Sequence, residues 1–150
     1  MIAVDTNLLV YAHREESDWH QEALSLLKQL AEGTSRWAIP WPCVHEFLSV
    51  VTHPSVYTPP TPMAVALDAM QVWLGSPSCR ALAESSDYFA TLKNLALQAK
   101  IRGPRIHDAR IAAICLENGV AELWSADRDL GRFRQLKVVN PLVRKRGGGE

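Results

Sequence analysis

Short apolar runs alternate along this chain with longer stretches in which apolar residues recur at helical spacing. This alternation is typical of an α/β domain with a mainly parallel central sheet. The expected strands are residues 1–4, 37–39, 78–82, 122–125 and 137–139. The expected helices are residues 19–30, 42–51, 63–74, 88–100 and 106–118, with Gly33 and Asn118-Gly119 as stops.

Length and cysteine content narrow the class of protein. A chain of 150 residues that is 47% hydrophobic can bury a core as one domain, to which we assign residues 1–142, leaving 143–150 as a flexible, basic, glycine-rich tail. Cys43, Cys79 and Cys115 are odd in number and widely spaced, which predicts core thiols. No stretch approaches the about 18 apolar residues that span a bilayer, so we expect a reducing, cytoplasmic setting.

Four acidic residues lie far apart in the sequence, but each stands at a place where a fold could bring them together. Asp5 and Asp127 each follow an expected strand, whereas Glu46 and Asp108 each lie near the start of an expected helix. In open parallel sheets, ligands bind beyond the carboxyl ends of the strands, where the strand order reverses. The sequence therefore predicts a functional site at that edge.

The residue types at this site predict a metal centre. Carboxylates without accompanying histidine or cysteine favour Mg²⁺ or Mn²⁺ over zinc, and a divalent ion would keep mutually repelling acids ionised. We expect Asp5, Glu46, Asp108 and Asp127 to hold one or two ions about 4 Å apart that activate a water for in-line attack on a phosphodiester. Asp5 ranks first as a ligand, Asp108 and Asp127 follow, and Glu46 either binds metal or orients water.

Polar neighbours of the acids are candidates for supporting roles. Asp129 could bind a second ion or hold a neighbouring group, and the sequence leaves open whether it or Asp127 lies closer to the metal. The remaining candidates, for hydrogen bonds to carboxylates or metal-bound waters, are Thr6, Asn7 and Ser125.

Ordinary structural roles compete with the metal hypothesis. Asp108 could cap a helix, Asp127 and Asp129 could form a turn, and Glu46 could be a surface residue. Asp5 resists such a reading, because an ionised acid at the end of a buried strand is costly unless a metal or another cation meets it.

Histidine and tryptophan positions carry weaker signals. The five histidines show no ligand spacing, and His107 is expected to be a helix-start residue. Trp37 and Trp124 are expected in the core, whereas the sequence leaves Trp41 open between packing and base stacking.

The formal net charge of zero hides an uneven distribution. Residues 1–99 hold 5 basic and 10 acidic side chains, whereas residues 100–150 hold 11 and 6. Basic residues that flank Asp108 and Asp127 are candidate RNA phosphate contacts, and the alternative is a solvated face with ordinary ion pairs. The candidates are Arg102, Arg105, Arg110 and Arg128.

The order of the acidic motifs resembles that of a known family. Residues 2–12, with the sequence Val-Asp-Thr-Asn-Leu-Leu-Val-Tyr-Ala, are similar to the opening of PIN domains. Glu46 in a helix, Asp108 in His-Asp-Ala-Arg-Ile-Ala-Ala, and Asp127 in Ser-Ala-Asp-Arg-Asp-Leu before Phe133 resemble the remaining motifs. Each motif is weak alone, but the resemblance covers residues 2 to about 141.

The small single-domain form resembles the VapC toxins of toxin-antitoxin pairs. The resemblance implies a three-layer α/β/α fold and a Mg²⁺- or Mn²⁺-dependent endoribonuclease that cleaves structured RNA, either tRNA or rRNA, leaving 5′-phosphate and 3′-hydroxyl ends. It also implies a VapB-like antitoxin as partner and a homodimer. Two rival functions remain at this point, a metal-dependent phosphatase acting on small esters and a non-catalytic module that binds RNA or protein.

Overall fold

The computed structural model describes residues 1–142, so the expected tail at 143–150 lies outside the described residues. Within residues 1–142 five strands form one sheet, in the order β3-β2-β1-β4-β5, and every neighbouring pair is parallel. The strands are β1 (Ile2–Val4), β2 (Trp37–Pro40), β3 (Cys79–Leu82), β4 (Glu122–Trp124) and β5 (Lys137–Val139). The mainly parallel sheet expected from the sequence is confirmed.

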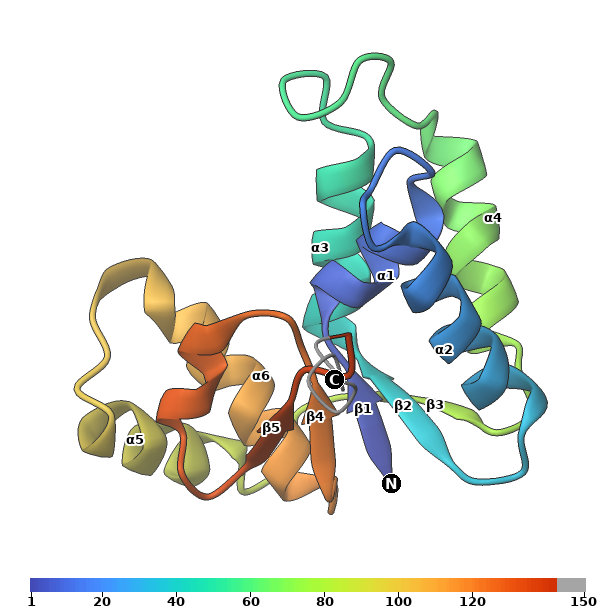
Figure 1. The fold of residues 1–150 in the computed structure, drawn as a ribbon. Coiled ribbons are helices and arrows are strands. Elements are labelled where there is room, and N and C mark those ends of the chain that lie inside the picture. The colour runs from blue at the N-terminus through green and yellow to red at the C-terminus, as the bar shows by residue number, and fades with distance from the viewer. Residues whose placement is uncertain (143–150) are drawn as a thin grey trace, which may run out of the picture.

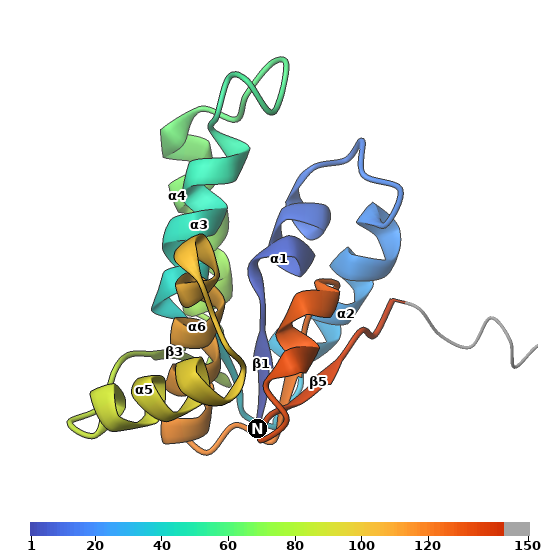
Figure 2. The same cartoon turned by 90° about the vertical axis from the view of Figure 1, so that its left-hand side faces the viewer.

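Helices cover both faces of this sheet (Figure 1). Figure 2 shows α1 and α2 on one side, and α3, α4, α5 and α6 on the other, which confirms the three-layer arrangement. The α-helices are α1 (Thr6–His13), α2 (His20–Glu32), α3 (Trp41–Val51), α4 (Met63–Leu74), α5 (Tyr88–Gln98) and α6 (Ile106–Glu117). Two short 3₁₀ helices, η1 (Gly103–Arg105) and η2 (Arg128–Arg132), precede α6 and follow β4.

The central strands are buried on both faces, which explains their short, continuously apolar sequences. All four residues of β2 are buried, and Trp37 is fully inaccessible, as expected for a core tryptophan. The edge strands β3 and β5 are partly exposed. Trp124 is half-buried against the core, and Cys79 is likewise less buried than the expected core thiols Cys43 and Cys115.

The strand order reverses between β1 and β4. From β1 the chain continues outward through β2 to β3, and it then returns to the other side of β1 to form β4 and β5. The backbone N–H of Asp5 donates to the carbonyl of Trp124 at 2.9 Å, so the two strands stay paired up to their carboxyl ends. The residues after β1 and β4 therefore meet at the switch point, where the sequence predicted the site.

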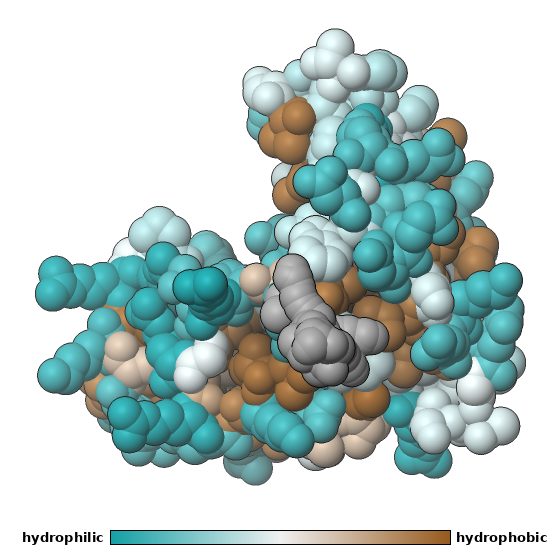
Figure 3. Space-filling model, in the orientation of Figure 1, coloured by the Kyte–Doolittle hydropathy of each residue, from teal (hydrophilic) through white to brown (hydrophobic). Residues whose placement is uncertain are grey.

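Two parts of the molecule stand out from the sheet. The α3–α4 pair with its connecting loop forms one, and α5, η2 and the start of α6 gather in the other (Figure 1). The space-filling view shows the surface indented between these two parts, with hydrophilic side chains predominating on both (Figure 3). No helix within residues 1–142 is long and apolar enough to cross a membrane.

The sequence missed one helix. We expected no helix directly after the first strand, but α1 begins at Thr6 and ends at His13. Its residues Leu8, Leu9, Val10 and Ala12 are buried, because α1 packs against both α2 and α3. A helix that is buried on several sides has a continuous run of apolar residues rather than an apolar stripe on one side. Such a run does not distinguish a helix from a strand.

Candidate metal and phosphodiester site

Asp5 occupies the carboxyl end of β1 and is 5% exposed. The Ser125 hydroxyl donates to its Oδ2 at 2.7 Å, and the Cys43 thiol donates to its Oδ1 at 3.5 Å. Burial nevertheless raises the pKa of Asp5 from 3.8 to about 6, against the lowering effect of these hydrogen bonds. Both donors are neutral, so in this environment the ionised form of Asp5 remains costly.

The loop after β4 is built around Ser125. Its hydroxyl, which donates to Asp5, also accepts from the backbone N–H of Asp127 at 2.9 Å. Asp127 Oδ1 in turn accepts from the N–H of Asp129 at 2.9 Å, as in the turn that the sequence offered as its alternative role. Asn7 Oδ1 accepts from the N–H of Ala126 at 3.2 Å, so Asn7 holds the loop backbone.

Glu46 and Asp108 face the same region from two helices. Glu46 lies in α3, where it is exposed, and its Oε1 accepts a hydrogen bond from the Thr6 hydroxyl at 2.6 Å. Asp108 lies in the first turn of α6, whose N-cap residue is Arg105. Partial burial raises its pKa, the negative charge of Asp127 raises it further, and Arg105 opposes this rise.

The four predicted acids line one pocket of about 220 Å³ between α1, α3, α6 and the β4 loop. Its other walls are Thr6, Asn7, Val10, Tyr11, Val50 and Ile111. Among residues 1–142, however, no three His, Cys, Asp or Glu side chains are gathered closely enough to form a finished metal site. Two of the four carboxylates are instead hydrogen-bonded to hydroxyls, Asp5 to Ser125 and Glu46 to Thr6.

Asp129 points away from this pocket. It does not line it, and its carboxylate forms an ion pair with Arg105 and a longer one, at 3.6 Å, with Arg132. Arg105 also reaches Asp108 at 3.6 Å. Of the two acids after β4, Asp127 is therefore the one positioned as a candidate ligand, and Asp129 anchors an arginine at the pocket rim.

The four predicted RNA contacts differ in their availability. Arg105 is engaged at the rim, and Arg110 pairs with Glu84 at 2.9 Å. Arg102 and Arg128 are exposed, and neither forms an ion pair within the described chain.

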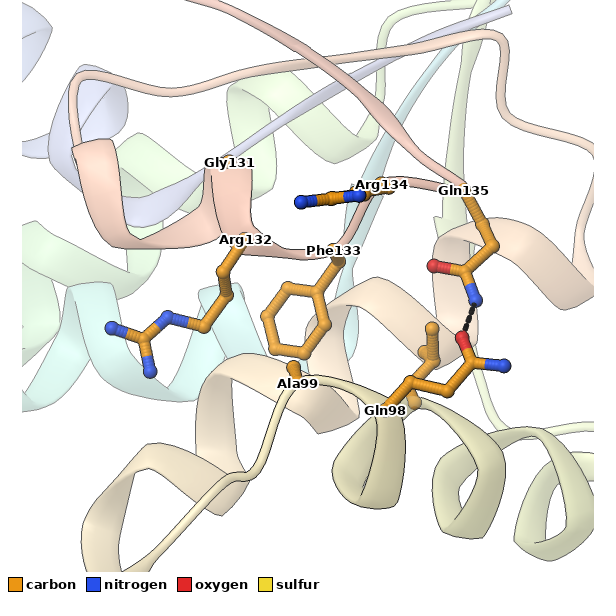
Figure 4. A pocket seen from close by; sticks show the side chains of 8 residues that line it. Gln98, Ala99, Gly131, Arg132, Phe133, Arg134 and Gln135 are labelled. Carbon is orange, nitrogen blue, oxygen red and sulfur yellow. Dashed lines mark hydrogen bonds between the residues drawn. The ribbon is translucent and has the colours of Figure 1, made fainter.

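A separate cleft of about 700 Å³ lies between the end of α5 and residues 131–135, which comprise the end of η2 and the segment after it. Figure 4 shows Arg132 to the left of the Phe133 ring and Arg134 above it, with a hydrogen bond from Gln135 to Gln98. The cleft is larger than the acidic pocket, but no acid of the predicted site lines it. All four predicted acids line the smaller pocket instead.

Cys43 is the residue whose contact with the site was not foreseen. The sequence predicted a core thiol, and it is fully buried, yet its thiol points to Asp5. Burial and the nearby Asp5 charge raise the thiol pKa, so Cys43 stays protonated and acts as a hydrogen-bond donor. Cys43 lies in the first turn of α3, which follows β2 directly. This position beside a strand end was the signal that could have placed it near the site.

A PIN domain family model matches residues 2–136 of the chain. The chain belongs to the PIN-domain family. Ribonuclease VapC43 of Mycobacterium tuberculosis is 36% identical to it over 142 residues, covering 95% of this chain and 96% of the relative. This PIN domain is therefore of the VapC type.

Solved structures show the same PIN fold. The toxin VapC20 of Mycobacterium tuberculosis, described as cleaving the sarcin-ricin loop, superposes with a TM-score of 0.64 at 15% identity, covering 87% of this chain and 93% of that chain. VapBC2 of Rickettsia felis, bound to a DNA fragment from its promoter, gives 0.65 at 19% identity, covering 93% and 98%. At these identities the likeness concerns the fold alone.

Proposed function

We propose that this PIN domain is a Mg²⁺- or Mn²⁺-dependent endoribonuclease and the toxin of a VapBC-type pair, cleaving a phosphodiester in structured RNA such as tRNA or rRNA. One observation carries the proposal. Four acids from separate segments line a single pocket at the switch point of a chain whose curated relatives are named ribonucleases.

The donor set fits a hard divalent cation. The pocket offers carboxylate oxygens from Asp5, Glu46, Asp108 and Asp127, and the nearby Cys43 stays a neutral thiol rather than a zinc ligand. The raised pKa values of Asp5 and Asp108 mean that ionising the cluster costs free energy, which a bound cation would offset.

The chain's own residues have distinct roles in this proposal. Asp5, Asp108 and Asp127 would hold the ion, and Glu46, kept in place by Thr6, would bind it or orient the attacking water. A bound Mg²⁺ or Mn²⁺ supplies a water of lowered pKa and neutralises charge on the phosphodiester. Arg105, anchored by Asp129, lies at the rim where an RNA phosphate would approach.

Partners are proposed on similar grounds. The structural neighbours include toxin-antitoxin complexes, among them VapBC2 and FitAB. We propose a VapB-like antitoxin for this chain, a homodimer as its assembly, and Arg102, Arg105, Arg110 and Arg128 as RNA contacts. The cytoplasm would supply the RNA and the antitoxin.

The test is cleavage of total RNA by purified, antitoxin-free protein in Mn²⁺ or Mg²⁺, with new 5′ ends mapped by sequencing. Discrete ends that vanish in EDTA and in Asp5→Asn protein would support the proposal. Asp68→Asn, which removes an exposed acid on α4 outside the pocket, is the matched control and should cleave normally. Folded protein that binds Mn²⁺ yet leaves all RNA intact would contradict it.

A further inference from the structure

A second pocket adjoins the acidic pocket, and we call it the flanking pocket. Its volume is about 380 Å³, and it shares Glu46, Asp108 and Ile111 with the acidic pocket. The residues that complete it are Pro42, His45, Pro104, His107 and Arg110. A ligand bound at the acids would therefore extend directly into this space.

Besides the shared acids Glu46 and Asp108, the walls of the flanking pocket offer apolar and imidazole surfaces against which a flat ring could pack. Pro42, Pro104 and Ile111 supply apolar surface, and His45 and His107 bring exposed imidazoles from α3 and α6. The charge of Arg110 is balanced by its ion pair with Glu84 at 2.9 Å, so the pocket is not simply an anion site.

Trp41 adds an aromatic surface next to this pocket. It opens α3, is 38% exposed, and lies beside His45 with ring centroids 6.2 Å apart and planes inclined by 32°. Exposed aromatic faces stack nucleic-acid bases with little regard for sequence.

We propose that the flanking pocket holds the base of the nucleotide adjoining the scissile phosphate, in an unpaired segment of the RNA. The inference rests on the proposed ribonuclease function, because it places the phosphodiester at the four acids. The shared walls bring base and phosphate sites into contact, and the volume falls in the range of small-ligand pockets, roughly 300–1,000 Å³. Unpaired bases are also what proteins read most readily in RNA.

Binding can be measured separately from cleavage. In an Asp5→Asn background, which should not cleave, the probe is a fluorescein-labelled RNA of eight random nucleotides, followed by anisotropy. Trp41→Ala and His107→Ala should each weaken binding about tenfold, the change expected from losing one stacking contact. Trp41→Phe should retain most of the affinity. Phe89→Ala, which removes an exposed aromatic ring from α5 outside both pockets, should leave it unchanged.

Cleavage mapping gives the second readout. With Asp5 intact and Mn²⁺ present, Trp41→Ala should raise KM more than it lowers kcat, and should alter the base preferred beside the cut. Unchanged affinity and unchanged preference in folded Trp41→Ala and His107→Ala proteins would overturn the inference. So would variants that lose affinity only for an antitoxin peptide, which would assign the pocket to a protein partner.

The two proposals fail in different ways. If wild-type protein cleaves RNA and both pocket variants behave like wild type, the nuclease stands and the base pocket is wrong. If no RNA is cleaved but the pocket variants lose binding to the oligonucleotide, the pocket stands as an RNA site and the nuclease proposal is wrong.

Discussion

Asp5 is the residue at which the proposed metal site and the stability of the fold oppose each other most directly. Its pKa is raised from 3.8 to about 6 in the folded metal-free protein, so the folded state holds this proton more tightly than the unfolded chain. The contribution of Asp5 to stability is therefore fully present below pH 3.8 and is lost as the pH rises through about 6. At neutral pH the buried charge destabilises the metal-free fold by roughly 3 kcal/mol.

Asp5→Asn should therefore stabilise the metal-free protein at pH 7.5 but not at pH 4. The check is urea denaturation of both proteins in EDTA at several pH values, with Asp68→Asn as control. In Mn²⁺ the order should reverse, because only the protein with Asp5 gains stability from the bound ion. Equal stability of wild type and Asp5→Asn at every pH would show that ionising the buried Asp5 carboxylate does not destabilise the fold.

Asp129→Asn separates the two acids that the sequence could not rank. Asp129 contacts Arg105 and Arg132 outside the acidic pocket, in ion pairs that are about 40% exposed. We expect Asp129→Asn to keep Mn²⁺ affinity, to change stability by less than about 1 kcal/mol, and to lower RNA cleavage by releasing Arg105. Asp127→Asn should instead weaken Mn²⁺ binding, which isothermal titration calorimetry can measure. The opposite ranking would make Asp129 the ligand.

At the scale of elements, Ser125 connects the ends of β1 and β4. The residue is 2% exposed, and its hydroxyl donates to Asp5 and accepts from the N–H of Asp127. Ser125→Ala removes both bonds and should lower the free energy of unfolding by about 1–3 kcal/mol in chemical denaturation. Ser125→Thr, which keeps a hydroxyl, should recover part of the loss. An unaffected Ser125→Ala protein would mean that the loop after β4 is held by other contacts.

The sequence predicted most elements because each has its own local signal. The helix Met63–Leu74 was predicted with the bounds that the structure has, since a proline precedes it. The strand Lys137–Val139 was also predicted with its observed bounds, since a short apolar run defines it. The α1 helix was missed, because burial against two helices removes the one-sided pattern. Asp5 and Asp127 could be placed from strand ends alone, whereas the Cys43 contact depends on how α3 packs over β1.

The sequence also could not predict which of the two acids after β4 faces the pocket, because this depends on a contact distant in the sequence. Asp127 precedes η2 and Asp129 lies in its first turn. Asp127 lines the acidic pocket, whereas Asp129 forms an ion pair with Arg105. Nothing in the local sequence distinguishes them, because the partner arginine comes from η1, more than twenty positions earlier.

At the scale of the whole molecule, the charge distribution sets how RNA would bind. The acids of the site come both from the acidic part of the chain, residues 1–99, and from the basic part, residues 100–150. The predicted phosphate contacts all come from the basic part. A nuclease with this layout gains affinity from phosphate contacts around an acidic centre, and such affinity falls as salt rises because counterions are released on binding.

We therefore expect the affinity of the Asp5→Asn protein for a single-stranded RNA to fall steeply between 50 and 200 mM KCl, values within the usual range for such tests. Arg128→Ala should reduce the slope of log affinity against log salt by about 0.7, the share of one phosphate contact. Arg80→Ala, an exposed arginine on β3 outside both pockets, should leave the slope unchanged. An Arg128→Ala slope equal to that of wild type would remove Arg128 from the RNA path, and Arg132 and Arg134 in the neighbouring cleft would then be the next arginines to replace.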